Sequence, residues 1–238
     1  MSTPDLRLPG GTLMTYLRVY DTIAPDGQRG GTPHVHLICS EVYVTLQGSG
    51  QVELLDVSGP RTINLTPGSA LVFSPGTIHR LLNPNSGLQI LVIMQNSGLP
   101  EHGDNVPTFP PHILNDASTF VQAMRAPTLN DAYRRRDLAV EGFLALQSAF
   151  AESEQAGQKA LSDFYTRAAR LMQPYFDRWA DVVKAGPLTE AEDTLHHLDA
   201  LHTENTHHLQ QARHQLITCA ATERIGFCGH LSPYPAPT

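Results

Sequence analysis

The stretch Thr32-Pro-His-Val-His-Leu-Ile-Cys-Ser-Glu41 decides the fold of this 238-residue sequence. His34 and His36 are two positions apart, so on a β-strand their side chains share one face, with Cα atoms roughly 6.5 Å apart. Glu41 lies five positions after His36, which is the wrong parity for an unbroken strand. For Glu41 to join the two histidines at one ion, a bulge or bend must lie between positions 37 and 40.

A second run, Phe73-Ser-Pro-Gly-Thr-Ile-His79, supplies a third imidazole. Three imidazoles and one carboxylate suit one divalent transition metal, such as iron, manganese, nickel or zinc. His79 is distant in sequence, so it reaches the same ion only if the strands close on one another. The alternative is a set of ordinary strand histidines. Four candidate ligands in two turn-punctuated, strand-like runs favour the metal site.

The two runs resemble the two sequence motifs of the cupin family. The first motif is H-x-H, then E, then six residues and G. This chain matches it at His34, His36, Glu41 and Gly48. The second motif reads G…P-x-G-x-x-H-x-x-x-N, and the chain matches it at Gly68, Gly76, His79 and Asn83. One departure is that Pro75 directly precedes the glycine, while Ser74 holds the usual proline position.

The resemblance covers residues 12–96 and implies a jelly-roll β-barrel. It also implies that the metal ligands point into the barrel and are His34, His36, Glu41 and His79. Cupins with this ligand set include dioxygenases, sugar and sugar-phosphate isomerases or epimerases, decarboxylases and non-catalytic binders. The ligands alone do not choose among these activities.

The amino-acid composition of the chain changes near residue 110. The first 110 residues hold 13 of the 18 glycines and 11 of the 18 prolines, whereas the remainder is rich in Ala, Leu, Gln, Glu and Arg. Turn signals in the first part separate eight predicted strands, at 13–23, 35–38, 42–46, 51–57, 62–65, 70–73, 78–82 and 88–94. Many short strands at close spacing indicate a sandwich or barrel.

Helical periodicity dominates the second part, which favours an α-helical unit after the β-rich one. We predict helices at 116–124, 132–153, 158–184 and 189–218. Pro174 is expected to kink the third helix and Gly186-Pro187 to stop it. Thr189 with Glu192 then predicts a capping box at the start of the fourth.

The predicted organisation is therefore a cupin β-barrel (12–96), a linker (97–114), a helical domain (115–220) and an irregular C-terminal tail (221–238). The helical domain is expected to be a helical hairpin or a three-helix bundle. The tail could pack back on the barrel or exchange with a neighbouring chain, and the sequence leaves this open.

The composition limits which classes of partner and which cellular compartment are expected. A net charge of −7 argues against a nucleic-acid or anionic-membrane partner, and no apolar run approaches the roughly 18 residues of a membrane span. Residues 1–10 lack the basic and apolar regions of a signal peptide. Three widely spaced cysteines, Cys39, Cys219 and Cys228, are not a disulfide framework and fit a reducing cytoplasm.

The leading functional hypothesis is a small-molecule metalloenzyme of dioxygenase type, in which Glu41 is both metal ligand and transient base. The alternatives are a cupin-type sugar or sugar-phosphate isomerase or epimerase, and a non-catalytic binding or sensor protein. By strand parity, the residues expected to line the cavity are Tyr43, Thr45 and Asn83. Asn83 could instead support His79. The expected partners are a small molecule and a second copy in a homodimer.

Several other polar residues are predicted to lie outside the site. Arg80 has the opposite parity to His79 and is expected to point away from it. Arg18 could anchor an anion, but a solvated strand face is favoured, and Cys39 is predicted to be a small buried filler. The last helix has six histidines without the i, i+4 spacing of a metal clamp, which favours a solvated face: His196, His197, His202, His207, His208 and His214.

Overall fold

The structural description covers residues 6–95 and 98–235 of a computed structural model of the chain. The barrel boundary predicted at residues 96 and 97 lies outside these residues. Residues 1–5, which belong to the segment considered for a signal peptide, and residues 236–238 of the predicted tail also lie outside them.

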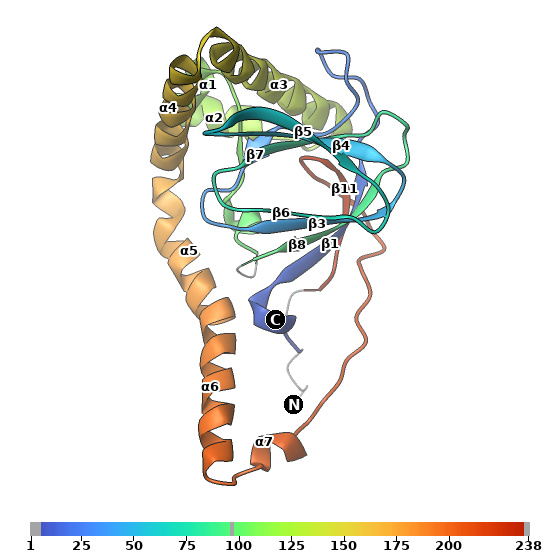
Figure 1. Ribbon diagram of the computed structural model, residues 1–238, viewed down its shortest axis with the longest axis vertical. Helices are drawn as coiled ribbons and strands as arrows, with labels where there is room; N and C mark the ends of the chain where they lie inside the picture. The colour runs from blue at the N-terminus through green and yellow to red at the C-terminus, as the bar shows by residue number, and fades with distance from the viewer. Residues whose placement is uncertain (1–5, 96–97, 236–238) are drawn as a thin grey trace.

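Two antiparallel sheets face each other and form the β-rich part of the molecule (Figure 1). One has the strand order β10-β11-β1-β8-β3-β6, and the other β5-β4-β7-β2-β9, where the last three strands along the chain are β9 Val106–Pro107, β10 Arg224–Ile225 and β11 Gly229–Pro233. The first eight strands are β1 Leu13–Val19, β2 His34–Val35, β3 Glu41–Gln47, β4 Gly50–Asp56, β5 Gly59–Leu65, β6 Ala70–Phe73, β7 Ile78–Leu82 and β8 Gln89–Met94. The β-rich plus α fold class, with a jelly-roll followed by helices, is confirmed.

All eight predicted strand segments contain strands, and several of them alternate buried residues with less buried ones, whereas β7 is buried throughout. In β8, for example, Ile90, Val92 and Met94 are buried, while the residues between them are half-exposed. Three strands are shorter than predicted: β1 ends at Val19, β8 begins one residue later at Gln89, and β2 is only two residues long because the chain bends after Val35.

The segment predicted as a linker has more regular structure than expected. It contains a 3₁₀ turn η2 at Pro100–His102, strand β9 at Val106–Pro107 and a short helix α1 at Pro111–Leu114. β9 completes the second sheet by pairing His34 with Pro107 and Val35 with Val106. The segment therefore supplies a second strand neighbour, beside β7, for the backbone hydrogen bonds of β2.

Helices α2 (Ala117–Met124), α3 (Leu129–Glu152) and α4 (Glu154–Met172) follow. Asp116 caps α2 by accepting a hydrogen bond from the Thr119 amide at 2.7 Å. α3 and α4 form a helical hairpin that contacts β5 on the outside of the sheets (Figure 1). Gly142 lets α3 pack closely against the segment that follows residue 107, since a Cβ there would lie 1.9 Å from the Thr108 carbonyl oxygen.

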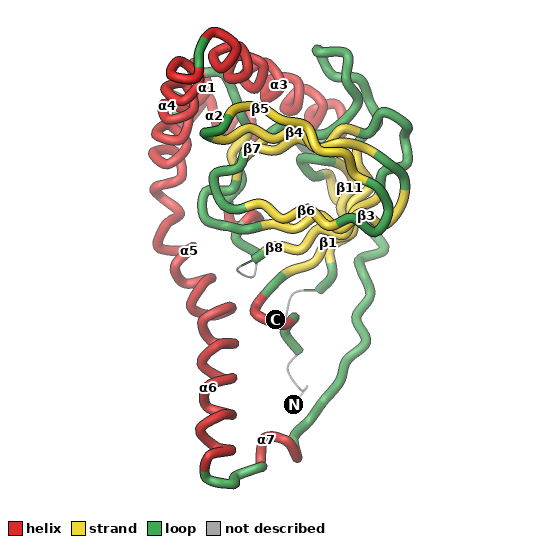
Figure 2. Tube along the Cα trace, in the orientation of Figure 1, coloured by secondary structure: helices red, strands yellow, loops and turns green. Residues whose placement is uncertain are grey.

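The long helical arm departs from the prediction at Gly186-Pro187 (Figure 2). After the expected break at Pro174 (η3, Gln173–Tyr175), α5 (Phe176–Val183) continues through a π-helical turn at Lys184–Leu188 into α6 (Thr189–His202). The predicted stop and the capping box at Thr189 were wrong. The wider π-turn accommodates the proline, and the Thr189 hydroxyl donates to the Lys184 carbonyl oxygen at 2.8 Å.

The last predicted helix also ends earlier than residue 218. After α6 and a short α7 (His207–Gln210), the chain runs extended back to the sheets and adds β10 (Arg224–Ile225) and β11 (Gly229–Pro233). β11 pairs with β1 over five residues. The tail, predicted to be irregular, thus contains two strands, and β11 covers the edge of β1 that would otherwise be open.

Among the described residues, no helix combines the length and the apolar character that crossing a membrane requires. The expected homodimer, the small-molecule partner and the cytoplasmic location stay predictions.

Candidate metal centre

Both sheets contribute to the predicted ligand quartet. β2 and β7 are neighbours in one sheet and place His34 directly opposite His79, whereas β3 in the facing sheet carries Glu41. The structure brings all four predicted ligands together: each is buried, and one donor atom from each of His34, His36, Glu41 and His79 lies within 4.8 Å of the others.

A bend between positions 37 and 40 turns Glu41 inward, as the parity of the sequence predicted. The bend is held by Asp104, whose buried carboxylate accepts hydrogen bonds from three successive amides, those of Leu37 (2.6 Å), Ile38 (3.2 Å) and Cys39 (2.9 Å). Sequence reasoning missed Asp104, since it lies in the segment read as a linker and no motif marks it.

Each imidazole ring is oriented by a backbone carbonyl oxygen. Nδ1 of His34 lies 2.8 Å from the Thr32 oxygen, and Nδ1 of His79 lies 3.0 Å from the Thr77 oxygen. Nδ1 of His36 contacts the Asp104 carbonyl oxygen. A carbonyl oxygen only accepts hydrogen bonds, so each Nδ1 carries a proton and Nε2 is the ring atom that each histidine turns toward the cluster.

The donor atoms at the centre of the cluster suit a cation better than hydrogen bonds among themselves. The distance from His79 Nε2 is 3.1 Å both to His34 Nε2 and to Glu41 Oε2, and His36 Nε2 lies 3.3 Å from the same oxygen. Glu41 Oε2 is buried without a hydrogen-bond partner. Lone pairs at these separations repel unless a positive charge lies between them, so the residues fit a divalent metal.

The charge states of two of the four residues, His34 and Glu41, suit metal binding. At a third, burial alone would lower the pKa of His36, but Glu41 and Asp104 raise it above its usual value. Burial lowers the pKa of His34 well below its usual value, reinforced by His79 and His36, so this ring stays neutral. Burial alone would raise the pKa of Glu41, but the neighbouring His79 and His36 hold it below its usual range. A neutral imidazole and an ionised carboxylate are the forms that metals bind.

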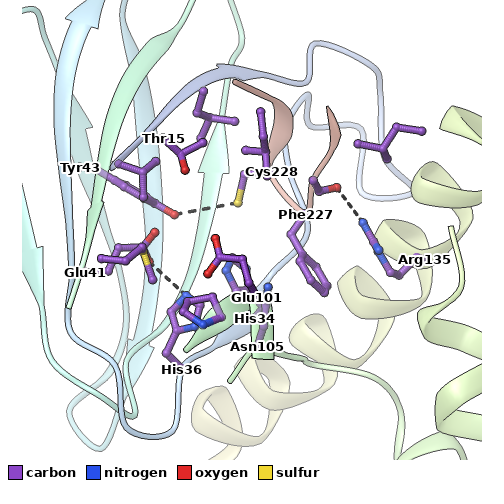
Figure 3. A pocket seen from close by; sticks show the side chains of 17 residues that line it. Thr15, His34, His36, Glu41, Tyr43, Glu101, Asn105, Arg135, Phe227 and Cys228 are labelled. Atoms are coloured by element: carbon purple, nitrogen blue, oxygen red, sulfur yellow. Dashed lines mark hydrogen bonds and ion pairs between the residues drawn. The ribbon is translucent and has the colours of Figure 1, made fainter. Parts of the chain in front are cut away.

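A cavity of about 250 Å³ borders the cluster (Figure 3). Its wall includes His34, His36, Glu41 and, as predicted, Tyr43. His79 is not part of the wall, although it is fully buried within the cluster. A metal held by the quartet would therefore have an open side toward the cavity, which is the mark of a catalytic site.

Two predicted cavity residues lie elsewhere. Thr45 is buried, and its hydroxyl accepts a hydrogen bond from the Ser69 hydroxyl at 3.1 Å. Asn83 donates to the Val19 carbonyl oxygen at 2.9 Å and accepts from the amides of Gly87 and Leu88, both at 3.1 Å. Parity predicted inward-facing side chains correctly, but these two are used to hold turns rather than to line the cavity.

The C-terminal hairpin forms part of the cavity wall, which the sequence did not reveal. Its tip places Phe227 against His34, with ring centroids 5.3 Å apart and planes 21° from parallel. The buried Cys228 lies next to it, with Sγ 3.9 Å from the Tyr43 hydroxyl. The tail therefore packs back on its own sheets in this structure, one of the two possibilities that the sequence left open.

The remaining sequence-based interpretations hold. Arg80 pairs with the carboxylates of Asp26 and Glu53, outside the quartet. Arg18 is exposed and pairs with Glu223, and Cys39 is buried with its thiol directed at the Gln95 carbonyl oxygen. Within residues 6–95 and 98–235, the quartet is the one group of metal-ligating side chains that meets these distance limits.

Removing the Asp104 carboxylate is expected to weaken metal binding without removing a ligand. Asp104→Ala leaves three amides of the bend without their acceptor, so Glu41 and His36 lose their fixed separation. Loss of such an outer partner typically lowers metal affinity by about 10- to 100-fold. Competition titration with a chromophoric chelator measures this, with Asp163→Ala, an exposed carboxylate on α4, as the control. Unchanged affinity in folded Asp104→Ala protein would contradict the assigned role.

Displacing the hairpin is expected to open the cavity. A Cβ on Gly229 would lie 2.0 Å from the Arg18 carbonyl oxygen, so Gly229→Val cannot keep the β11–β1 pairing. We expect a loss of about 1–3 kcal/mol in unfolding free energy and stronger binding of a hydrophobic dye. Gly87→Val is the matched control, since nothing lies within 4 Å of a Cβ there. Equal stability of the two variants in urea would show that the hairpin is not held as described.

Comparison with known proteins gives partial likenesses only. No protein-family model and no curated protein matches the sequence. Similar solved structures include a double-stranded β-helix protein from Klebsiella pneumoniae (11% identity, 40% of this chain, 75% of that chain, TM-score 0.31). Another is KdgF from Halomonas sp. (25% identity, 28% of this chain, 57% of that chain, TM-score 0.25). A third is a TDP-fucose-3,4-ketoisomerase from Campylobacter jejuni (18% identity, 34% of this chain, 58% of that chain, TM-score 0.29). The chain spans less than two thirds of the latter two.

The fold and the site together define a jelly-roll protein with a candidate divalent-metal centre. What the centre does has to follow from its own residues.

Proposed function

We propose that the protein is a mononuclear metal-dependent enzyme of the cupin type that acts on a small molecule by dioxygenase-type oxidation. The observation that carries this proposal is the convergence of three oriented Nε2 atoms and one ionised carboxylate beside a cavity. Bound there, a divalent metal would supply a Lewis acid that holds a substrate through one or two oxygen atoms. His34, His36, Glu41 and His79 would hold it.

The chain's own residues define what else the site can do. Glu41 has a second carboxylate oxygen besides the one facing the histidines, and it could accept a proton from a substrate hydroxyl as the substrate binds. The apolar part of the wall, Leu17, Val92, Met94, Phe227 and Leu231, would exclude water from the reacting atoms.

The size and chemistry of the cavity favour a small substrate with an apolar part. At about 250 Å³ it lies below the usual range for drug-sized ligands, which is about 300–1,000 Å³. A nucleotide-linked sugar is much larger than this, and part of the wall, including Leu17, Val92 and Met94, is apolar. Oxidation of a small enolic or catechol-like compound is therefore proposed ahead of sugar isomerisation, with a non-catalytic sensor as the competing class.

Oxygen consumption tests the proposal. Protein reconstituted with Fe(II), Ni(II) or Mn(II) is incubated with enolic and catechol-type compounds that fit the cavity, and oxygen uptake is followed by electrode. We expect metal-dependent uptake that Glu41→Gln abolishes. Turnover of aldoses or ketoses without oxygen uptake would favour an isomerase. Fully metallated protein that does neither would support the sensor alternative.

A further inference from the structure

Arg135 is a buried cation at the cavity wall without an anionic partner. The residue is 7% exposed, and it borders the same cavity as Glu41. Among the described residues, no carboxylate lies within 4.0 Å of its guanidinium, whereas the two other buried arginines have one: Arg80 contacts Asp26, and Arg136 contacts Asp137. A buried charge without a counter-ion is costly, so this position calls for a reason.

The contacts that Arg135 does make leave much of its hydrogen-bonding capacity unused. Its Nη2 donates to the Gly226 carbonyl oxygen at 2.7 Å, and its Nη1 reaches the Met124 carbonyl oxygen only at 3.4 Å. The Nε atom is buried without a partner. A guanidinium has five N–H donors, so two carbonyl acceptors do not satisfy it.

The surroundings fix the orientation of the guanidinium without neutralising it. Its carbon lies 4.1 Å from the centroid of the Phe227 ring, a cation–π contact. Burial lowers the pKa of Arg135, which is what removal from water does to an unpaired cation. Arginine nonetheless stays protonated in proteins. Figure 3 shows Phe227 between Arg135 and the histidine cluster, so positive charge would lie on both sides of this ring once a metal is bound.

We propose that the small molecule taken by this cavity carries a carboxylate that Arg135 binds, while an oxygen at its other end binds the metal. This inference rests on the proposed function for the metal end only. An anionic oxygen would satisfy the unused N–H donors and compensate the buried charge. Arg–carboxylate bonds are among the strongest polar contacts in proteins. Glu101, the remaining acid of the wall, is exposed and lies on η2, so it does not neutralise Arg135.

The test compares acids with their neutral amides. Zinc-loaded protein is titrated calorimetrically, at constant ionic strength, with 3-hydroxybutyrate, 4-hydroxybutyrate and 6-hydroxyhexanoate, and then with the matching amides. We expect the best-fitting acid to bind about tenfold or more tightly than its amide, the size of one charged hydrogen bond. Equal binding of acid and amide, or no binding of either, would overturn the inference.

A carboxylate can also bind the metal directly, so variants are needed to decide whether Arg135 or the metal binds it. Arg135→Gln is expected to lose the preference for acids. Arg134→Gln should keep it, because that substitution removes the same charge from an exposed neighbouring position on α3. If Arg135→Gln does not fold, Arg135→Lys takes its place and is expected to weaken the preference. A folded Arg135 variant with the wild-type preference would show that this residue only anchors the hairpin.

Metal content separates this inference from the proposed function. Each sample is analysed for zinc, and Arg135→Gln is expected to retain as much as the wild type. Protein that retains no zinc would contradict the proposed function. The acid and amide titrations in that metal-free protein would still report on Arg135, whose charge does not depend on the metal.

Discussion

Glu41→Gln is expected to lower the affinity for a divalent transition metal by more than about 100-fold, beyond the 10- to 100-fold typical of outer-shell partners. The substitution preserves the shape of the side chain but removes the only negative charge in the quartet. A neutral amide oxygen is a much weaker ligand for a divalent ion than a carboxylate. Competition with a chelator of known affinity at neutral pH measures the change.

The same substitution is also expected to lower the stability of the metal-free protein, because His79 and His36 hold the pKa of Glu41 below its usual range and so stabilise its charge in the fold. Circular dichroism therefore confirms that the variant is folded before metal is added. Glu101→Gln is the matched control: Glu101 borders the same cavity, lies outside the quartet, and should leave metal affinity unchanged. If the two variants bound metal equally well, Glu41 would not be a ligand.

The second large effect concerns stability. Arg80→Met is expected to lower the unfolding free energy by about 3 kcal/mol, because it leaves the carboxylates of Asp26 and Glu53 unpaired in a largely buried position. This corresponds to a drop of roughly 6–12 °C in melting temperature for a chain of this size. Arg61→Met is the control, since the Arg61–Asp56 pair is exposed and should contribute at most about 1 kcal/mol.

The cost of Arg80→Met should depend on pH in a defined direction. Burial alone would raise the pKa of Asp26, but Arg80 holds it below its usual value. The pair therefore stabilises the wild type at pH values above the pKa of Asp26 in the unfolded chain. This contribution fades as the pH falls through the pKa of Asp26 in the folded protein. Burial raises the pKa of Glu53. Without Arg80 both acids protonate readily, so the stability difference should be largest near neutral pH and narrow toward pH 4, as urea unfolding would measure. A constant difference would mean that Arg80 acts by packing alone.

Local patterns predicted the residues whose position follows from short-range geometry. His34 and His36 share a face because strands alternate, and the five-residue interval to Glu41 forced the bend that the structure shows. The strand segments followed from Gly- and Pro-rich turns between β-favouring runs.

Residues whose role depends on distant contacts could not be predicted in this way. Asp104 holds the bend from a segment more than 60 residues away, and Phe227 reaches His34 only because the tail adds a strand to β1. Nothing in the sequence separates Arg135 from its neighbours Arg134 and Arg136, and only its burial against the hairpin without a carboxylate marks it as different. Pro187 failed as a helix stop because a π-turn absorbed it, which local propensity does not anticipate.

Elemental analysis of the purified protein tests the central claim most directly. Wild-type protein and the His34→Ala/His79→Ala double variant are purified without chelators, confirmed as folded by circular dichroism, and analysed for transition metals per chain. The wild type is expected to carry a single divalent transition metal per chain, and the double variant is expected to carry essentially none. A folded double variant with the same stoichiometric metal as the wild type would show that the quartet is not the metal site.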